Sequence, residues 1–82
     1  MMTRFNRLVD ALKDRYHNAP EGEKVLAINV FAIEFADELK QVEEKDRKEI
    51  ALLGTTKISY ATEINKGMKL AKYVQLKPEA KS

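Results

Sequence analysis

Apolar residues recur at helical spacing in the first part of the chain. They occupy positions i, i+3, i+4, i+7 and i+11, which places them on one stripe of a helix: Phe5, Leu8, Val9, Leu12 and Tyr16. Thr3 suits the N-cap, because its hydroxyl can accept a free amide of the first turn. Arg15 and His17 put positive charge in the last turn, where it is favourable. The pattern predicts a helix over about residues 3–17, broken by residues 18–20.

The next apolar segment is wider and predicts a helix that starts near Pro20, a residue suited to a first helical position. Its broad stripe contains Val25, Ile28, Phe31, Ala32, Phe35, Ala36, Leu39 and Val42. A second, narrower stripe contains Leu26, Val30 and Ile33. A helix that is apolar on two sides is central in its domain or lies in an interface. An 82-residue chain has few elements to cover both sides. We therefore expect a homo-oligomer through Leu26, Val30 and Ile33.

One short helix and one long helix are expected after the charged residues that follow. Asp46 and Glu49 resemble a capping box, which predicts a short third helix over about residues 47–53 that Gly54 ends. One continuous helix over residues 21–53 is the alternative. Thr55 or Thr56 can cap a fourth helix over about residues 57–75, in which Gly67 allows a close helix–helix approach.

The fold class that follows is all-α, a small bundle of three long helices and one short helix. Few glycines and prolines interrupt the helical pattern. We expect one domain over residues 1–76 and a frayed C-terminal tail over residues 77–82, which contains Pro78.

The most distinctive local pattern is the segment KEIALLGTTKISYATEI, residues 48–64, in which an Ile-Ala pair precedes a Leu-Gly turn and a second helix. It resembles the helix-turn-helix of bacterial DNA-binding proteins. The spacing from Ala51 to Gly54 is one residue shorter than usual, so the angle between the helices would differ. The resemblance implies that the second helix exposes its first turns to DNA. The residues in those positions are Thr56, Lys57, Ser59 and Thr62.

A basic face is expected further along the same helix. Lys66, Lys69 and Lys72 lie at i, i+3 and i+6 with Tyr73 beside them, and they could track a phosphate backbone or dock an acidic protein. Lysines on the outside of a surface helix are ordinary, so the signal is weak. No arginine follows Arg47, which disfavours tight sequence-specific DNA binding through the last helix.

Acidic and basic residues are unevenly distributed along the chain, and this bears on the basic face. The net charge is only +2. Residues 1–17 carry four basic and two acidic groups, residues 18–49 five and nine, and residues 50–82 six and two. The acidic middle could attract the basic end, within or between chains, at no more than about 1 kcal/mol per exposed pair. That interpretation competes with a nucleic-acid surface.

The residues for catalysis are scarce. There is no cysteine, the single histidine, His17, has no nucleophile at a meaningful spacing, and the three glycines form no phosphate loop. Glu34 and Asp37 with Asp46 and Glu49 are loosely similar to the Mg²⁺-binding pairs of all-helical nucleotide pyrophosphatases. No basic phosphate-binding partner stands at a convincing place. We expect no enzyme, no cofactor and no metal site.

Two hypotheses for function follow. The first is a small non-enzymatic binding or regulatory protein that acts on an unidentified protein partner as a homo-oligomer. The second is a nucleic-acid-binding regulator that uses the helix-turn-helix-like segment near residues 47–64 and the basic last helix. The longest apolar-rich run is 12 residues and the N-terminus has no apolar signal region, so we expect no membrane segment and a cytoplasmic location.

Overall fold

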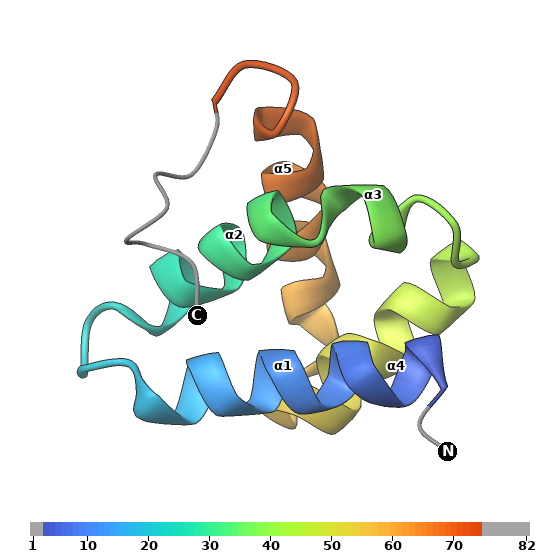
Figure 1. The fold of residues 1–82 in the computed structure, drawn as a ribbon. Helices are drawn as coiled ribbons and strands as arrows, with labels where there is room; N and C mark the ends of the chain where they lie inside the picture. Colours follow the sequence, from blue (N-terminus) through green and yellow to red (C-terminus); the bar gives the residue numbers. More distant parts are fainter. Residues whose placement is uncertain (1–2, 75–82) are drawn as a thin grey trace.

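Helices account for all the regular structure in residues 3–74, the part of the chain that the computed structural model describes. They are α1 (Arg4–Asn18), α2 (Lys24–Glu34), α3 (Ala36–Leu39), α4 (Glu44–Thr55), the 3-10 helix η1 (Ile58–Tyr60) and α5 (Ala61–Leu70). No strand occurs among those residues. The all-α prediction and the helix-turn-helix-like corner are both confirmed (Figure 1).

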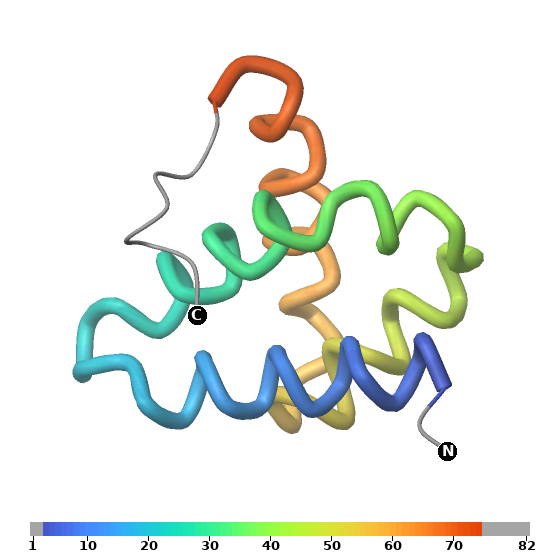
Figure 2. Tube along the Cα trace, viewed as in Figure 1, coloured from blue at the N-terminus to red at the C-terminus, as the bar shows by residue number. Residues whose placement is uncertain are grey.

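The four longer helices surround one core. α1 packs against α2 and α4, and α5 packs against the same two helices from the other side. The chain reverses between α1 and α2 and again between α4 and α5 (Figure 2). Ten apolar side chains from these elements and from α3 are almost fully buried: Leu8, Val9, Leu12, Ile28, Phe31, Ala32, Leu39, Ile50, Ala51 and Ile64.

The first helix agrees with its prediction. The Thr3 hydroxyl accepts a hydrogen bond from the backbone N–H of Asn6 at 3.1 Å and caps the helix. Leu8, Leu12 and Tyr16 of the apolar stripe are buried.

The second helix is shorter than predicted at both ends. It starts at Lys24 instead of near Pro20, because Gly22 has a φ of +89° and the N–H of Glu23 closes a turn onto the Pro20 carbonyl. It ends at Glu34, since Phe35 leaves helical geometry. The i→i−4 bonds Phe35 to Phe31 and Leu39 to Phe35 continue across this break, so the broad stripe stays in phase and enters the core, except for Val25, which is 40% exposed. The continuous helix over residues 21–53 is wrong.

The third predicted helix corresponds to α4, which begins earlier and ends later than predicted. Its N-cap is Glu43, which makes no side-chain capping bond, and Asp46 lies inside the first turn instead of capping it. Gly54 lies within the helix and does not end it. A Cβ at this position would stand 2.8 Å from Cδ2 of Leu12. Gly54 therefore serves the close contact of α4 with α1. The left-handed residue that ends the helix is Thr56, with φ 70°.

The fourth predicted helix is divided. Lys57 is extended, η1 follows, and α5 runs only over Ala61–Leu70. Residues 71–73 form a turn, and the predicted end at Gln75 lies outside the described residues, as does the predicted tail over 77–82. A Cβ on Gly67 would lie 2.5 Å from the Ala32 Cβ. The predicted close approach at Gly67 is confirmed, and the helix that it approaches is α2.

Candidate nucleic-acid interface

The corner between α4 and η1 is held by one buried threonine. The Thr55 hydroxyl, only 2% exposed as a residue, donates to the Ala51 carbonyl at 2.7 Å and accepts from the Lys57 N–H at 3.2 Å. This pair of bonds connects the last turn of α4 to the start of the next element. Thr55 is thus the residue that shapes the corner, a role beyond the helix cap that the sequence predicts for it.

One face of η1 and α5 is turned to solvent. Residues 59, 62, 66, 69 and 73 are separated by steps of three and four, so they follow one line along the helix. All of them are exposed, whereas Ala61, Ile64 and Gly67 on the opposite side are buried. We call the exposed line the outer face: Ser59, Thr62, Lys66, Lys69 and Tyr73.

The predicted binding residues separate into three groups. Five of them form the outer face. Thr56 and Lys57 are exposed in the turn that leads to it. Lys72 is exposed beyond the end of α5, in a turn where its N–H donates to the Lys69 carbonyl, and its position falls outside the three- and four-residue steps of the outer face. Tyr73, 84% exposed, also lies beyond the helix.

Asn29 fixes the position of α5 against α2. Its side-chain amide donates to the Glu63 carbonyl oxygen at 3.0 Å and to the Glu63 carboxylate at 3.2 Å. That hydrogen bond, followed by the Lys66 ammonium 3.2 Å away, lowers the pKa of the Glu63 carboxyl below its ordinary value. The contact between Asn29 and Glu63 was not predicted from the sequence. The signal available for it was a polar residue, Asn29, inside an apolar run.

A pair of tyrosines joins the end of α1 to the start of α5. The rings of Tyr16 and Tyr60 are 5.9 Å apart between centroids, and Lys24 and Lys57 lie over them at 5.2 and 5.6 Å. Burial, and then the neighbouring Tyr60, raises the pKa of the Tyr16 hydroxyl. This contact positions the first turn before α5.

The acidic middle of the chain pairs with α1. Both carboxylate oxygens of Glu34 accept from Nη2 of Arg15 at 3.0 Å, and Glu38 accepts from Arg7. Within residues 3–74 neither Lys69 nor Lys72 takes part in an ion pair. In that part of the chain the acidic middle does not neutralise the basic end.

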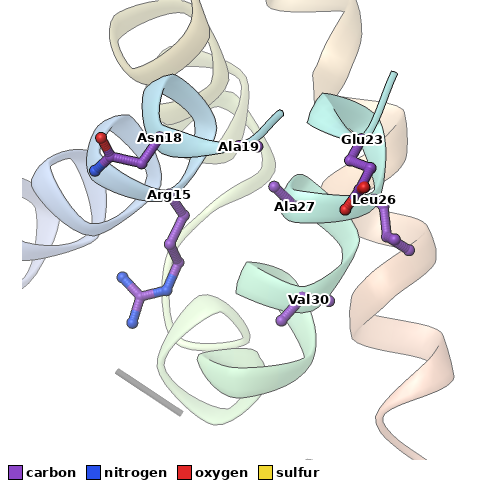
Figure 3. A pocket seen from close by; sticks show the side chains of 7 residues that line it. All are labelled: Arg15, Asn18, Ala19, Glu23, Leu26, Ala27 and Val30. Carbon is purple, nitrogen blue, oxygen red and sulfur yellow. The ribbon is translucent and has the colours of Figure 1, made fainter. Parts of the chain in front are cut away.

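The predicted oligomer residues lie at the surface. Leu26 is 57% exposed, and Val30 and Ile33 are half-buried. Leu26 and Val30 border a hollow of about 310 Å³ between α1 and α2, into which Arg15 reaches (Figure 3). Ile33 is not part of that hollow. Oligomerisation stays a prediction.

Two further observations concern the carboxylate pairs and the membrane segment considered from the sequence. Glu34, one of the four acidic residues compared with the Mg²⁺-binding pairs, forms an ion pair with Arg15. No helix in residues 3–74 has the length and apolar character required to cross a membrane.

Comparison with known proteins gives one family. No curated protein and no solved structure matches the chain significantly. The family model for an HTH-like domain matches residues 4–77, nearly the whole chain and far more than the corner around residues 47–64. The chain therefore belongs to the HTH-like domain family.

Proposed function

We propose that the protein is a regulator that binds duplex DNA and that η1 and α5 enter the major groove. Membership in the HTH-like domain family is the observation that carries this proposal. The outer face supports it, because a recognition helix presents exposed polar residues from its first turns to the groove. The family match favours this function over the hypothesis of a protein partner. We infer that the protein acts by binding and not by catalysis.

The chemistry of the outer face indicates what kind of contacts dominate. Ser59 and Thr62 can exchange hydrogen bonds with base edges or phosphates, whereas Lys66 and Lys69 supply positive charge for phosphates. No arginine lies on this face, and arginine is the commonest reader of guanine. Phosphate contacts should therefore provide most of the affinity, and discrimination between sequences should be modest.

The test is a titration of labelled duplex DNA, followed by fluorescence anisotropy at 50 and 200 mM salt. If Lys57, Lys66 and Lys69 each neutralise one phosphate, the logarithmic salt slope is roughly −2.7, and the fourfold rise in salt lowers affinity by about 40-fold. The variant Lys57→Ala/Lys66→Ala should weaken binding to all sequences and reduce the slope by about 2.

The matched control is Arg4→Ala/Lys13→Ala, which removes two exposed charges from α1 that belong to no ion pair within residues 3–74. It should leave the slope unchanged. Absence of binding at 50 mM salt, or equal weakening by the two double variants, contradicts the proposal.

A second proposal concerns association of the protein with itself. Leu26, more than half exposed beside the half-buried Val30 and Ile33, gives α2 an apolar outer strip that the described residues cover only in part. We propose that two copies pair through this strip, as helix-turn-helix proteins that read two half-sites do. Val30→Glu should then convert a dimer to a folded monomer in sedimentation experiments, because a charge in a dry interface is costly. Lys13→Glu on α1 is the control. A wild-type protein that is monomeric at high concentration contradicts this proposal.

A further inference from the structure

A basic hollow lies beside the outer face, between the end of α3, the start of α4 and the last part of α5. Its volume is about 360 Å³. The residues around it within the described range 3–74 are Lys40, Glu44, Arg47, Asn65, Met68, Lys69 and Lys72. Four of these residues are cations and only Glu44 is an acid, so the hollow carries a net charge of about +3 at neutral pH. Lys69 belongs both to the hollow and to the outer face.

Arg47 is held in place at the wall of this hollow. Its Nη1 donates to the carbonyl oxygens of Val42 at 2.8 Å and Leu39 at 3.3 Å, and its Nε donates to Oδ1 of Asn65 at 3.2 Å. These bonds connect α4 to the end of α3 and to α5. A guanidinium fixed in this way loses little conformational freedom when it binds a further group.

Unused donors remain at the same place. Within residues 3–74 the Nη2 group of Arg47 makes no hydrogen bond, and no buried side-chain nitrogen or oxygen there lacks a partner, so Nη2 reaches solvent. The Asn65 oxygen accepts from Arg47, which leaves both amide N–H donors of Asn65 without a partner in that part of the chain. The hollow therefore combines preorganised N–H donors with the mobile ammonium groups of Lys40, Lys69 and Lys72.

We propose that this hollow binds a phosphate group. A phosphate offers several acceptor oxygens and negative charge, which are the two properties that the donors and cations of the hollow complement. If the proposed function holds, on which this source of the group rests, the ligand is a backbone phosphate of the DNA duplex beside the groove that α5 occupies. The contact would then fix the position of α5 along the groove, because phosphate contacts set register. A free phosphorylated small molecule is the other source of the same chemistry.

The first arm of the test uses DNA and the variant Lys40→Ala/Lys72→Ala. Both lysines are exposed and belong to no ion pair within residues 3–74, so their removal should leave the fold intact. We expect the logarithmic salt slope of DNA binding to fall by about 1, because the hollow holds one phosphate. Arg4→Ala/Lys13→Ala is the charge-matched control. If DNA binds the wild type and the two variants behave alike, the hollow is not a phosphate site on DNA, while the proposed function stands.

The second arm uses inorganic phosphate and nuclear magnetic resonance, with sodium chloride at equal ionic strength as the reference. Phosphate should shift the Asn65 side-chain amide and the Arg47 Nε–H signals in the wild type and in the α1 control. The shifts should be at least several-fold smaller in Lys40→Ala/Lys72→Ala. Such shifts without any DNA binding would support a site for a free phosphorylated ligand and remove the proposed function. No phosphate-specific shift together with an unchanged DNA salt slope overturns the proposal.

Discussion

Within residues 3–74, Thr56 is the one non-glycine residue with a positive φ. It is exposed and has a φ of 70°, the left-handed region that β-branched residues rarely adopt. That conformation costs a non-glycine residue roughly 1–2 kcal/mol, and glycine adopts it freely. Glycine also has more conformational freedom to lose on folding, which offsets roughly 0.5–1 kcal/mol of the gain. We therefore expect Thr56→Gly to raise the free energy of unfolding by about 0.5–1 kcal/mol in urea titrations.

The control for this prediction is Thr62→Gly. Thr62 is also an exposed threonine, but it lies inside α5 in ordinary helical geometry, so glycine relieves no strain there and should lower stability. If Thr56→Gly is no more stable than the wild type, the side chain of Thr56 contributes to the turn as much as its backbone strain costs.

At the same scale, sequence reasoning found the residue types of the site but not their roles. The helix-turn-helix resemblance predicts Ser59 and Thr62, and helical spacing predicts Lys66 and Lys69 as a separate basic face. The hydrogen bond between Arg47 and Asn65 could not be predicted, since it connects positions 18 apart and depends on how α4 crosses α5. A left-handed Thr56 was also out of reach, because glycine is the usual residue at such a position and Gly54 stood two residues away.

At the scale of elements, the contact of α2 with α5 depends on Gly67. A Cβ at this position would lie 2.5 Å from the Ala32 Cβ and 2.7 Å from the Asn29 carbonyl oxygen. The second atom belongs to the backbone, so the helices must move apart to accept a methyl group. In an open helix, Gly→Ala stabilises by about 1 kcal/mol. Here we expect Gly67→Ala to lower the free energy of unfolding by roughly 1–3 kcal/mol, the usual cost of overpacking.

The matched control is Lys69→Ala, two residues further along α5 on its outer face and outside any ion pair within residues 3–74. It should change the free energy of unfolding by less than about 0.5 kcal/mol. Thermal melts followed by circular dichroism measure both variants. A Gly67→Ala protein as stable as the wild type would show that α2 and α5 are not in close contact.

Helix lengths were the least predictable property of the elements. The predicted broad stripe of α2 and α3 is buried from Ile28 to Leu39 except for the partly buried Phe35, and it gives no sign of the break at Phe35, because the i→i−4 bonds keep phase across it. The glycines were the second difficulty. Gly54 predicts a helix end by its usual preference, whereas here the close approach of Leu12 demands it inside the helix. Close contacts between helices leave no periodic pattern in a single sequence.

At the scale of the molecule, the four longer helices form a closed ring of contacts. α1 touches α2, α2 touches α5, α5 touches α4, and α4 returns to α1. Buried side chains from all four enter the same core, which includes Leu12, Phe31, Ile50 and Ile64. Arg15 and Glu34 add a tie between α1 and α2, at 17% and 12% side-chain exposure. No helix can leave this ring without opening two interfaces and exposing part of the shared core.

The ring predicts a single cooperative unfolding transition. A chain of this size should have a free energy of unfolding of roughly 4–12 kcal/mol, which is too small to divide between independent parts. Circular dichroism reports all helices, while the change in tyrosine fluorescence reports mainly the junction where Tyr16 meets Tyr60, because the third tyrosine, Tyr73, is already 84% exposed in the folded protein. Both signals should have the same urea midpoint in the wild type, and the two midpoints should move together in Gly67→Ala, although Gly67 lies at a different interface. If the tyrosine signal keeps its midpoint while the helical signal shifts, α2 and α5 unfold separately from α1, and the ring of contacts does not act as one unit.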